Sequence, residues 1–180
     1  MLSSRIIGWG HFLPQKIMTN NDLSKIVDTN DEWIISRTGI TQRFIAEKKE
    51  LTSDLAIRAG KKAIKKAGIK SNDIDYIILA TTTPDQTFPS TACKVQGSLK
   101  IGNKPSFDIQ AVCSGFIYSL QLADSLIKSN KAKNILVIGA ETLSKIVDWE
   151  DRRTCVLFGD GAGAVIVKAE DTEDQQGILS

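Results

Sequence analysis

The stretch that decides the fold runs from Ser106 to Glu141 and reads "SFDIQAVCSGFIYSLQLADSLIKSNKAKNILVIGAE". It opens with a short strand, "SFDIQA", and closes with "NILVIGAE", a continuous apolar run typical of a strand that is covered on both faces. Between the two strands, apolar residues recur at helical spacing, at Phe116, Leu120, Ala123 and Ile127. This spacing predicts a helix that packs one face on a sheet.

The same alternation continues on either side of this stretch. "TSDLAIRAGKKAIKKAG" (residues 52–68) and "STACKVQGSLKIG" (90–102) predict helices, and "DYIILAT" (75–81) predicts another covered strand. "RIIGWG" (5–10) and "GAGAVIVKAE" (161–170) predict the first and last strands. The resulting order β, α, β, α, β, α, β, β indicates an α/β fold with a largely parallel sheet. Because no crossover helix precedes the last strand, we expect that strand to pair antiparallel.

One more helix is predicted near the N-terminus, in "TNDEWIISRTG". Thr29 has the residue type of an N-cap, and Glu32 would complete a capping box with it. Gly39 supplies the left-handed stop.

Composition limits the class of protein. The chain has 180 residues, a net charge of +2, 42% hydrophobic residues and no apolar run near the ~20 residues of a membrane helix. We therefore expect a soluble, cytoplasmic protein without affinity for nucleic acid or membranes. The three cysteines are far apart and there is one histidine, so that reduced thiols and no metal site are expected. The polar stretch 171–180 reads as the start of a linker after a unit formed by residues 1–170.

Cys113 is the candidate nucleophile. It follows a predicted strand, where ligands bind in α/β sheets, and it precedes a helix expected to begin near Ser114. A helix N-terminus favours the thiolate, and Gly115 would permit close approach of a substrate. The alternative is a buried apolar side chain, the commoner fate of a free cysteine. Cys93 and Cys155 are expected in the core.

Trp33, Arg37 and Arg152 have the residue types that would sandwich a base and hold phosphates, although Trp33 could equally be a core residue. "FGDGAGA" (residues 158–164) predicts a tight turn in which Asp160 bonds neighbouring N–H groups. His11 is expected as a surface residue of the first loop.

Five segments carry a family resemblance: "GHFLPQKIMTNNDL", "VDTNDEWIISRTGI", "ATTTPDQTFPSTAC", "DIQAVCSGF" and "FGDGAGAVIV". With them, the chain resembles the N-terminal half of the β-ketoacyl-acyl-carrier-protein synthase III family, which initiates type II fatty acid synthesis. The resemblance implies a thiolase-like fold in which two α/β halves form an αβαβα structure, usually as a homodimer. This chain would supply one half, with a mostly parallel five-stranded sheet.

The resemblance also implies an acyltransferase. Cys113 matches the cysteine that accepts the acyl group of an acyl-CoA, typically acetyl-CoA, before condensation with malonyl-acyl-carrier protein. Trp33 and Arg152 match residues that stack on the CoA adenine, and Thr29 and Arg37 match residues near its nucleotide and phosphates. Phe88 matches the residue that reaches across the dimer into the partner's acyl pocket. No cofactor is implied, because the CoA thioester is a substrate.

The family's catalytic histidine and asparagine lie in the second half, and His11 matches neither. One expectation is therefore a shortened copy of an active synthase. The alternatives are a non-catalytic remnant or dimer-forming module, and another condensing enzyme of the thiolase superfamily.

Overall fold

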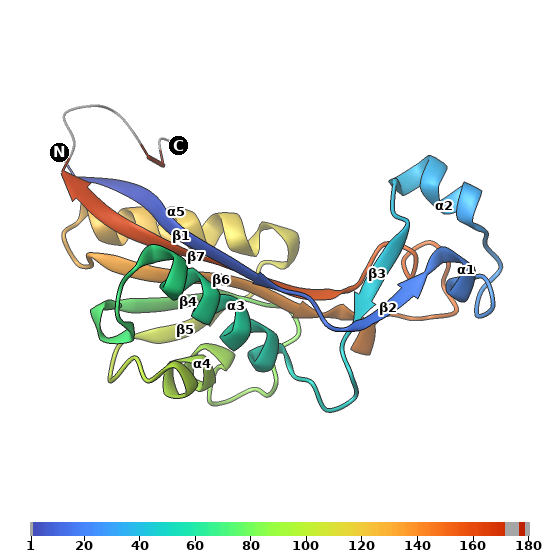
Figure 1. The fold of residues 1–180 in the computed structure, drawn as a ribbon, viewed down its shortest axis with the longest axis horizontal. Coiled ribbons are helices and arrows are strands. Elements are labelled where there is room, and N and C mark those ends of the chain that lie inside the picture. The colour runs from blue at the N-terminus through green and yellow to red at the C-terminus, as the bar shows by residue number, and fades with distance from the viewer. Residues whose placement is uncertain (1, 172–176, 179–180) are drawn as a thin grey trace.

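The computed structural model describes residues 2–171 and 177–178 (Figure 1). The strands of the main sheet are β1 (Leu2–Phe12), β4 (Tyr76–Ala80), β5 (Ser106–Ile109), β6 (Asn134–Thr142) and β7 (Asp160–Asp171). The helices packed on it are α3 (Thr52–Ala67), α4 (Thr91–Leu99) and α5 (Gly115–Lys128). A separate lobe contains β2 (Lys16–Thr19), α1 (Asn20–Leu23), α2 (Asp31–Thr38) and β3 (Gln42–Ile45).

The main sheet has the strand order β1-β7-β6-β4-β5. β4 runs parallel to both β5 and β6, whereas β7 is antiparallel to both β6 and β1. The predicted largely parallel sheet with an antiparallel last strand is therefore confirmed. The parallel strands β4, β5 and β6 end at the same edge of the sheet, and this edge faces the lobe (Figure 1).

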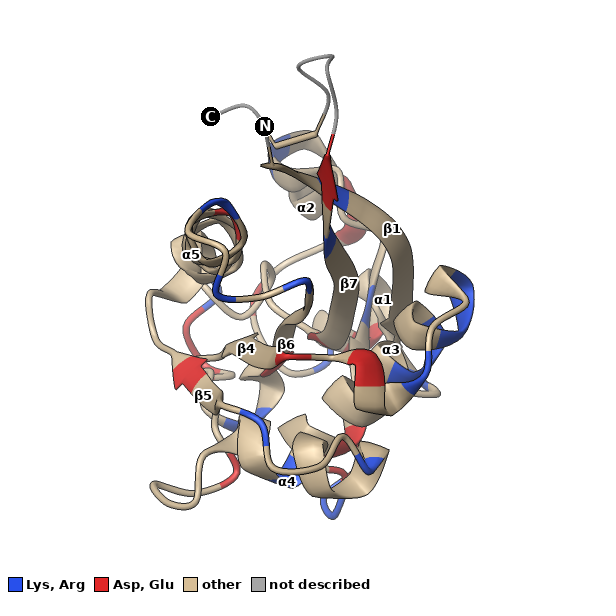
Figure 2. Cartoon of the chain, turned by 90° about the vertical axis from the view of Figure 1, so that its left-hand side faces the viewer, with Lys and Arg blue, Asp and Glu red and all other residues tan. Residues whose placement is uncertain are grey.

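Helices cover both faces of the sheet (Figure 2). α3 and α4 pack on one face, where Leu79, Leu136 and Ile138 are buried among their side chains. α5 packs on the other face, against Ile78, Ile135 and Val137. Alternate residues of β4 and β6 thus enter different cores, which explains why these strands are apolar throughout.

β1 approaches α3 very closely, and two glycines permit this. A Cβ added at Gly8 would lie 2.5 Å from the backbone nitrogen of Ala67. A Cβ added at Gly10 would lie 2.4 Å from the carbonyl oxygen of Ala59. Both contacts are with helix backbone, which cannot move aside as a flexible side chain could.

The lobe was not predicted from the sequence, apart from α2. β2 and β3 pair antiparallel, and the lobe has its own core around Leu23, Ile34 and Val156. The predicted capping box of α2 is wrong. Asn30, not Thr29, caps this helix, and its side chain accepts a hydrogen bond from Trp33 N at 2.8 Å. Gly39 ends the helix in the left-handed conformation, as predicted.

Two further expectations are modified. β1 extends well beyond residues 5–10, so that His11 lies on this strand opposite Gly163 and not in a loop. Of the predicted linker, residues 172–176 and 179–180 lie outside the described residues. Within it, Ile178 N donates a hydrogen bond of 2.9 Å to Ser4 O and so lies against β1. None of the described helices has the length and apolar character needed to cross a bilayer.

We expect Gly8→Ala to lower the free energy of unfolding by about 1–3 kcal/mol, because the added methyl group forces β1 away from α3. Gly97→Ala is the matched control, since a Cβ there meets nothing within 4 Å. This control should raise stability by roughly 0.5–1 kcal/mol, as alanine replaces glycine within a helix. Urea denaturation measures both, and equal effects would contradict the close contact.

Candidate functional site

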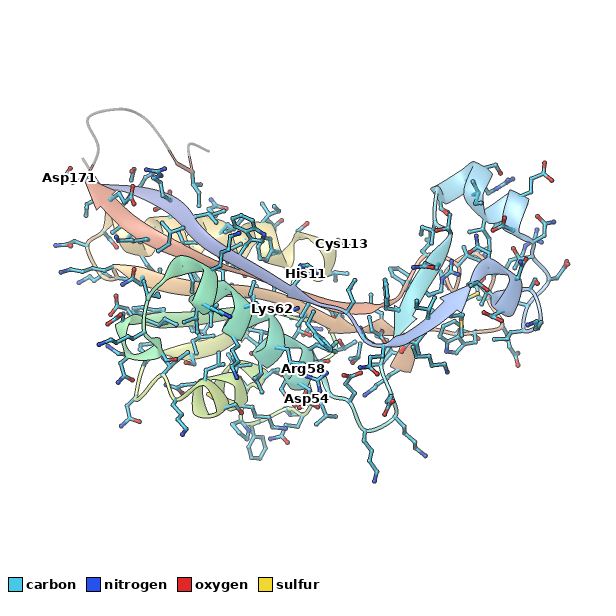
Figure 3. The ribbon with its side chains drawn as sticks, in the orientation of Figure 1. His11, Asp54, Arg58, Lys62, Cys113 and Asp171 are labelled. Carbon is cyan, nitrogen blue, oxygen red and sulfur yellow. The ribbon has the colours of Figure 1, made fainter. Side chains whose placement is uncertain are left out.

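Cys113 lies on a 3-10 turn, Val112–Ser114, between β5 and α5. Its side chain is exposed, so the alternative of a buried apolar cysteine is wrong. The turn stands at the edge where β4, β5 and β6 end, on the side of the sheet covered by α5 (Figure 3). The ends of parallel strands are the usual ligand-binding edge of an α/β sheet.

The backbone around Cys113 is unusual. Val112 has a φ of 48°, in the left-handed region that β-branched residues seldom adopt. After the turn, α5 begins at Gly115, where an added Cβ would lie 3.1 Å from the Cβ of Ala80. The start of α5 therefore packs directly on the last residue of β4, and this packing holds the Cys113 turn over the end of the sheet.

The loop that follows β4 carries Phe88, whose side chain is 82% exposed. Two carboxylates hold this loop in place. Asp85 accepts a hydrogen bond from Ser53 N at 3.0 Å and pairs with Lys94 at 3.1 Å. Asp108, on β5, accepts bonds from the N–H groups of Thr91 and Ala92, each at 2.8 Å. The loop is thereby tied to both α3 and the N-terminus of α4.

The lobe brings the three predicted nucleotide-binding residues together. The guanidinium carbons of Arg37 and Arg152 lie 4.5 Å and 4.9 Å from the ring centroid of Trp33. Arg152 also donates a hydrogen bond of 2.8 Å to Asp28 O. We call Trp33, Arg37 and Arg152 the cation–aromatic clamp.

Thr29 lies immediately before this clamp in the chain. Its hydroxyl oxygen is buried and has no hydrogen-bond partner among the described residues. Buried hydroxyl groups normally have a partner, but this buried atom is not accessible to a ligand in the present conformation.

Arg43 supports the clamp, and no feature of the sequence marked it. Its side chain is only 4% exposed, and burial lowers the pKa of the guanidinium. It donates to Asn20 Oδ1 and Val156 O, both at 2.9 Å. Asn20 in turn donates to Asp31, in the first turn of α2, at 2.8 Å. A chain of hydrogen bonds thus connects β3 to the helix that carries Trp33.

The remaining candidates have structural roles. Asp160 accepts bonds from Ala46 N at 2.6 Å and Ser144 N at 2.8 Å. These N–H groups are distant in the sequence and β7 begins at Asp160, so the predicted tight turn with bonds to neighbouring N–H groups is wrong. Cys155 is buried, and burial raises the pKa of its thiol, whereas Cys93 is half-buried. Exposed His11 uses its carbonyl oxygen to accept a bond from Lys62, at 2.9 Å. The described residues contain no group of three or more potential metal ligands.

Comparison with known proteins connects this arrangement to a family. The family model "3-Oxoacyl-[acyl-carrier-protein (ACP)] synthase III" matches residues 107–180. The β-ketoacyl-acyl-carrier-protein synthases III of Rickettsia canadensis and Wolbachia pipientis are 57% and 60% identical to the chain. These matches cover 99% and 100% of the chain and 56% of each relative.

A solved structure agrees. The crystal structure of 3-oxoacyl-acyl-carrier-protein synthase III from Aquifex aeolicus superposes with a TM-score of 0.91 at 58% identity. The superposition covers 96% of this chain and 55% of that one. The chain is thus an α/β protein of the thiolase-like class. Over its whole length it is similar to β-ketoacyl-acyl-carrier-protein synthases III, and it spans about half the length of the relatives it matches.

We expect iodoacetamide to label Cys113 before Cys93, and Cys93 before Cys155, because exposure decreases and the pKa of the Cys155 thiol is raised. Peptide mapping at successive times measures the order. Cys113→Ala should abolish the fastest phase. Labelling of all three thiols at one rate would contradict the exposed position of Cys113.

Asp85 should make the free energy of unfolding depend on pH. Burial raises the pKa of its carboxyl, but the hydrogen bonds from Ser53 and Lys94 outweigh this effect, and the pKa falls below its ordinary value of 3.8. The stabilisation is therefore present above about pH 4 and is lost as the pH falls through the folded-state pKa. Asp85→Asn should cost about 2 kcal/mol at pH 6, with a smaller difference below pH 4.

Denaturation at several pH values measures the Asp85 effect. Glu150→Gln is the control, because the Glu150 side chain is exposed and makes no hydrogen bond within the described part of the chain. A difference between wild type and Asp85→Asn that is independent of pH would contradict the assignment.

Proposed function

We propose that this chain carries the acyl-accepting site of a β-ketoacyl-acyl-carrier-protein synthase III, with Cys113 as the nucleophile. The observation that carries the proposal is the exposed thiol of Cys113, on a strand-to-helix turn at the sheet edge that faces the clamp lobe. A reactive cysteine needs this combination of access and a helix N-terminal environment.

In the proposed first step, the Cys113 thiolate attacks the carbonyl carbon of an acyl-CoA, most simply acetyl-CoA. The carbonyl oxygen becomes a transient oxyanion, the bond to the CoA sulfur breaks, and CoA leaves as a thiolate that takes up a proton. The backbone N–H of Cys113 is the proposed oxyanion donor. The first N–H group that is bonded within the turn is that of Ser114, which donates to Ala111 O. The Cys113 N–H lies one residue earlier and is not used in that bond.

The cation–aromatic clamp is the proposed site of the CoA nucleotide. Trp33 and Arg152 supply planar surfaces for the adenine, and the guanidinium of Arg37 supplies charge for the phosphates. Thr29, four residues before Trp33 in the chain, is the proposed further contact of the nucleotide. No cofactor is proposed, because CoA enters as part of the substrate.

In the proposed second step, malonyl-acyl-carrier protein loses CO₂, and the carbanion attacks the carbonyl carbon of the acyl-cysteine. The bond from that carbon to the Cys113 sulfur breaks, which releases the thiolate and gives a β-ketoacyl-acyl-carrier protein. The resemblance assigns this step a histidine and an asparagine. The one histidine of the chain, His11, lies on β1 and matches no such position. We therefore propose acyl transfer, but not condensation, for these 180 residues alone. The proposed location is the cytoplasm.

We further propose a homodimer in which Phe88 enters the partner's acyl pocket. Its side chain is 82% exposed and is therefore accessible to a partner, which supports this role. Exposed Val112, Ile117 and Tyr118 near the start of α5 form a surface suited to the family's second α/β half. Residues 1–170 are the proposed first half.

A non-catalytic remnant or dimer-forming module is not favoured, because Cys113 is accessible and the clamp residues are assembled. Another condensing enzyme of the thiolase superfamily is also not favoured, because the relatives reported above carry the synthase III name at 57% identity or more.

Incubation with acetyl-CoA tests the proposal. We expect one acetyl group on Cys113 by mass spectrometry, none in Cys113→Ala, and no β-ketoacyl product after malonyl-acyl-carrier protein is added. Trp33→Ala should slow acetylation by at least about tenfold, the effect of losing roughly 1.4 kcal/mol of binding, while leaving iodoacetamide labelling unchanged. Acetylation of Cys93 or Cys155 at the same rate would overturn the assignment.

A further inference from the structure

Glu141 is a charged residue near the C-terminal end of β6 for which the acyl-transfer scheme has no role. Residues two apart on a strand point to the same face, so Glu141 shares a face with Gly139. An added Cβ at Gly139 would lie 3.3 Å from the ring of Phe116, on α5. Glu141 therefore lies on the α5 side of the sheet, which is also the side of Cys113.

The Glu141 carboxylate binds the turn that follows β4. Its Oε1 accepts a hydrogen bond from Thr82 N at 2.7 Å, and its Oε2 accepts one from Thr83 N at 3.1 Å. The hydroxyl of Thr83 donates a short bond of 2.5 Å to Oε2, and that of Thr81 a longer one of 3.4 Å. One half-buried side chain thus satisfies two backbone and two side-chain donors.

The turn is also tied to other elements through Thr83. Its hydroxyl accepts a bond from Thr142 N at 2.8 Å, and its carbonyl oxygen accepts one from Thr52 at 2.6 Å. The end of β6 and the start of α3 are therefore connected to the same three residues. Because Thr83 is buried, each of these bonds lies in a poorly hydrated environment, in which loss of an acceptor is costly.

This turn is continuous with the surroundings of Cys113. Thr81 N donates to Ile109 O at 3.1 Å, beside the segment that leads from β5 to Cys113. The preceding residue, Ala80, is the one on which Gly115 packs. In the other direction, the chain continues from Thr83 into the loop that carries Phe88. A shift of the turn would therefore move both the support of Cys113 and the adjacent loop.

We propose that Glu141 is a positioning residue for acyl transfer: it holds the Thr81–Thr83 turn so that the acyl thioester can be placed against Cys113. This role rests on the proposed function. Glu141 contacts neither the thiol nor any reacting atom in the proposal, and it acts only through the turn.

The chemistry requires a carboxylate at this position. Each of its two oxygens faces a donor, and ionised acceptors make stronger bonds than neutral ones. Glutamine has the same shape, but it offers one acceptor and an NH₂ group. In Glu141→Gln, the NH₂ group of the amide would face a backbone N–H, so that two donors oppose each other. We therefore expect the turn to loosen, although the volume of the side chain is unchanged.

Asp75 provides a matched control at the opposite end of the same strands. It precedes β4, and its Oδ2 accepts bonds from Lys133 N at 2.8 Å and Asn134 N at 3.1 Å. Asp75→Asn therefore removes a carboxylate that also binds two backbone N–H groups, but far from the Cys113 turn. If acetylation falls only because the fold is less stable, Glu141→Gln and Asp75→Asn should be affected equally.

The experiment compares the wild-type chain, Glu141→Gln, Glu141→Asp and Asp75→Asn by thermal unfolding, acetylation from acetyl-CoA, iodoacetamide labelling of Cys113, and amide hydrogen exchange. We expect acetylation of Glu141→Gln to fall about tenfold to a hundredfold, as for a misplaced substrate. Its labelling by iodoacetamide should be undiminished, and exchange should rise in residues 81–90. Asp75→Asn should acetylate normally at a comparable loss of melting temperature.

Partial recovery in Glu141→Asp would support the positioning role, because the charge is retained while the reach is shorter. This variant also provides the comparison if Glu141→Gln does not fold. Equal acetylation defects in Glu141→Gln and Asp75→Asn would overturn the proposal, as would unchanged exchange in residues 81–90. If the wild type is not acetylated, the proposed function fails, and hydrogen exchange alone decides whether Glu141 holds the turn.

Discussion

Backbone N–H groups at the ends of strands and helices need acceptors, and the ends of this sheet depend on how that need is met. Carboxylates supply several of the acceptors there. Asp75 binds the segment before β6, Asp85 and Asp108 bind the first turns of α3 and α4, Glu141 binds the turn after β4, and Asp160 connects the lobe to the turn after β6. Each one brings together segments that are distant in the sequence. An unpaired donor at these positions would cost about 1–3 kcal/mol.

The sequence predicted the layered sheet because the relevant signals are local. Apolar runs identified β4 and β6, and helical spacing identified α3, α4 and α5, since burial on one or two faces leaves a periodic pattern. Cys113 was found for a related reason, because the strand before it and the helix after it both have local signals. Together they place the cysteine at the turn between the two elements. Its exposure was not decided by the sequence, since a buried thiol fits the same pattern.

The lobe and its supports could not be predicted in the same way. β2 and β3 have four residues each, too few to show a period. The helix-capping prediction failed because Thr29 and Asn30 are both suitable residue types, and only the backbone geometry selects Asn30. Arg43 and Glu141 act through partners 113 and 58 positions away, Val156 and Thr83, and no local pattern indicates such pairs.

The two parts of the molecule are held in different ways. Inside the lobe, Arg43 bonds to Asn20 and Val156, and Asn20 bonds to Asp31. Between the lobe and the sheet, the Asp160 carboxylate accepts bonds from Ala46 N and Ser144 N. Loss of the Asp160 carboxylate would therefore loosen this junction and leave the bonds inside the lobe in place. The clamp would keep its internal arrangement while its distance and direction from Cys113 became variable.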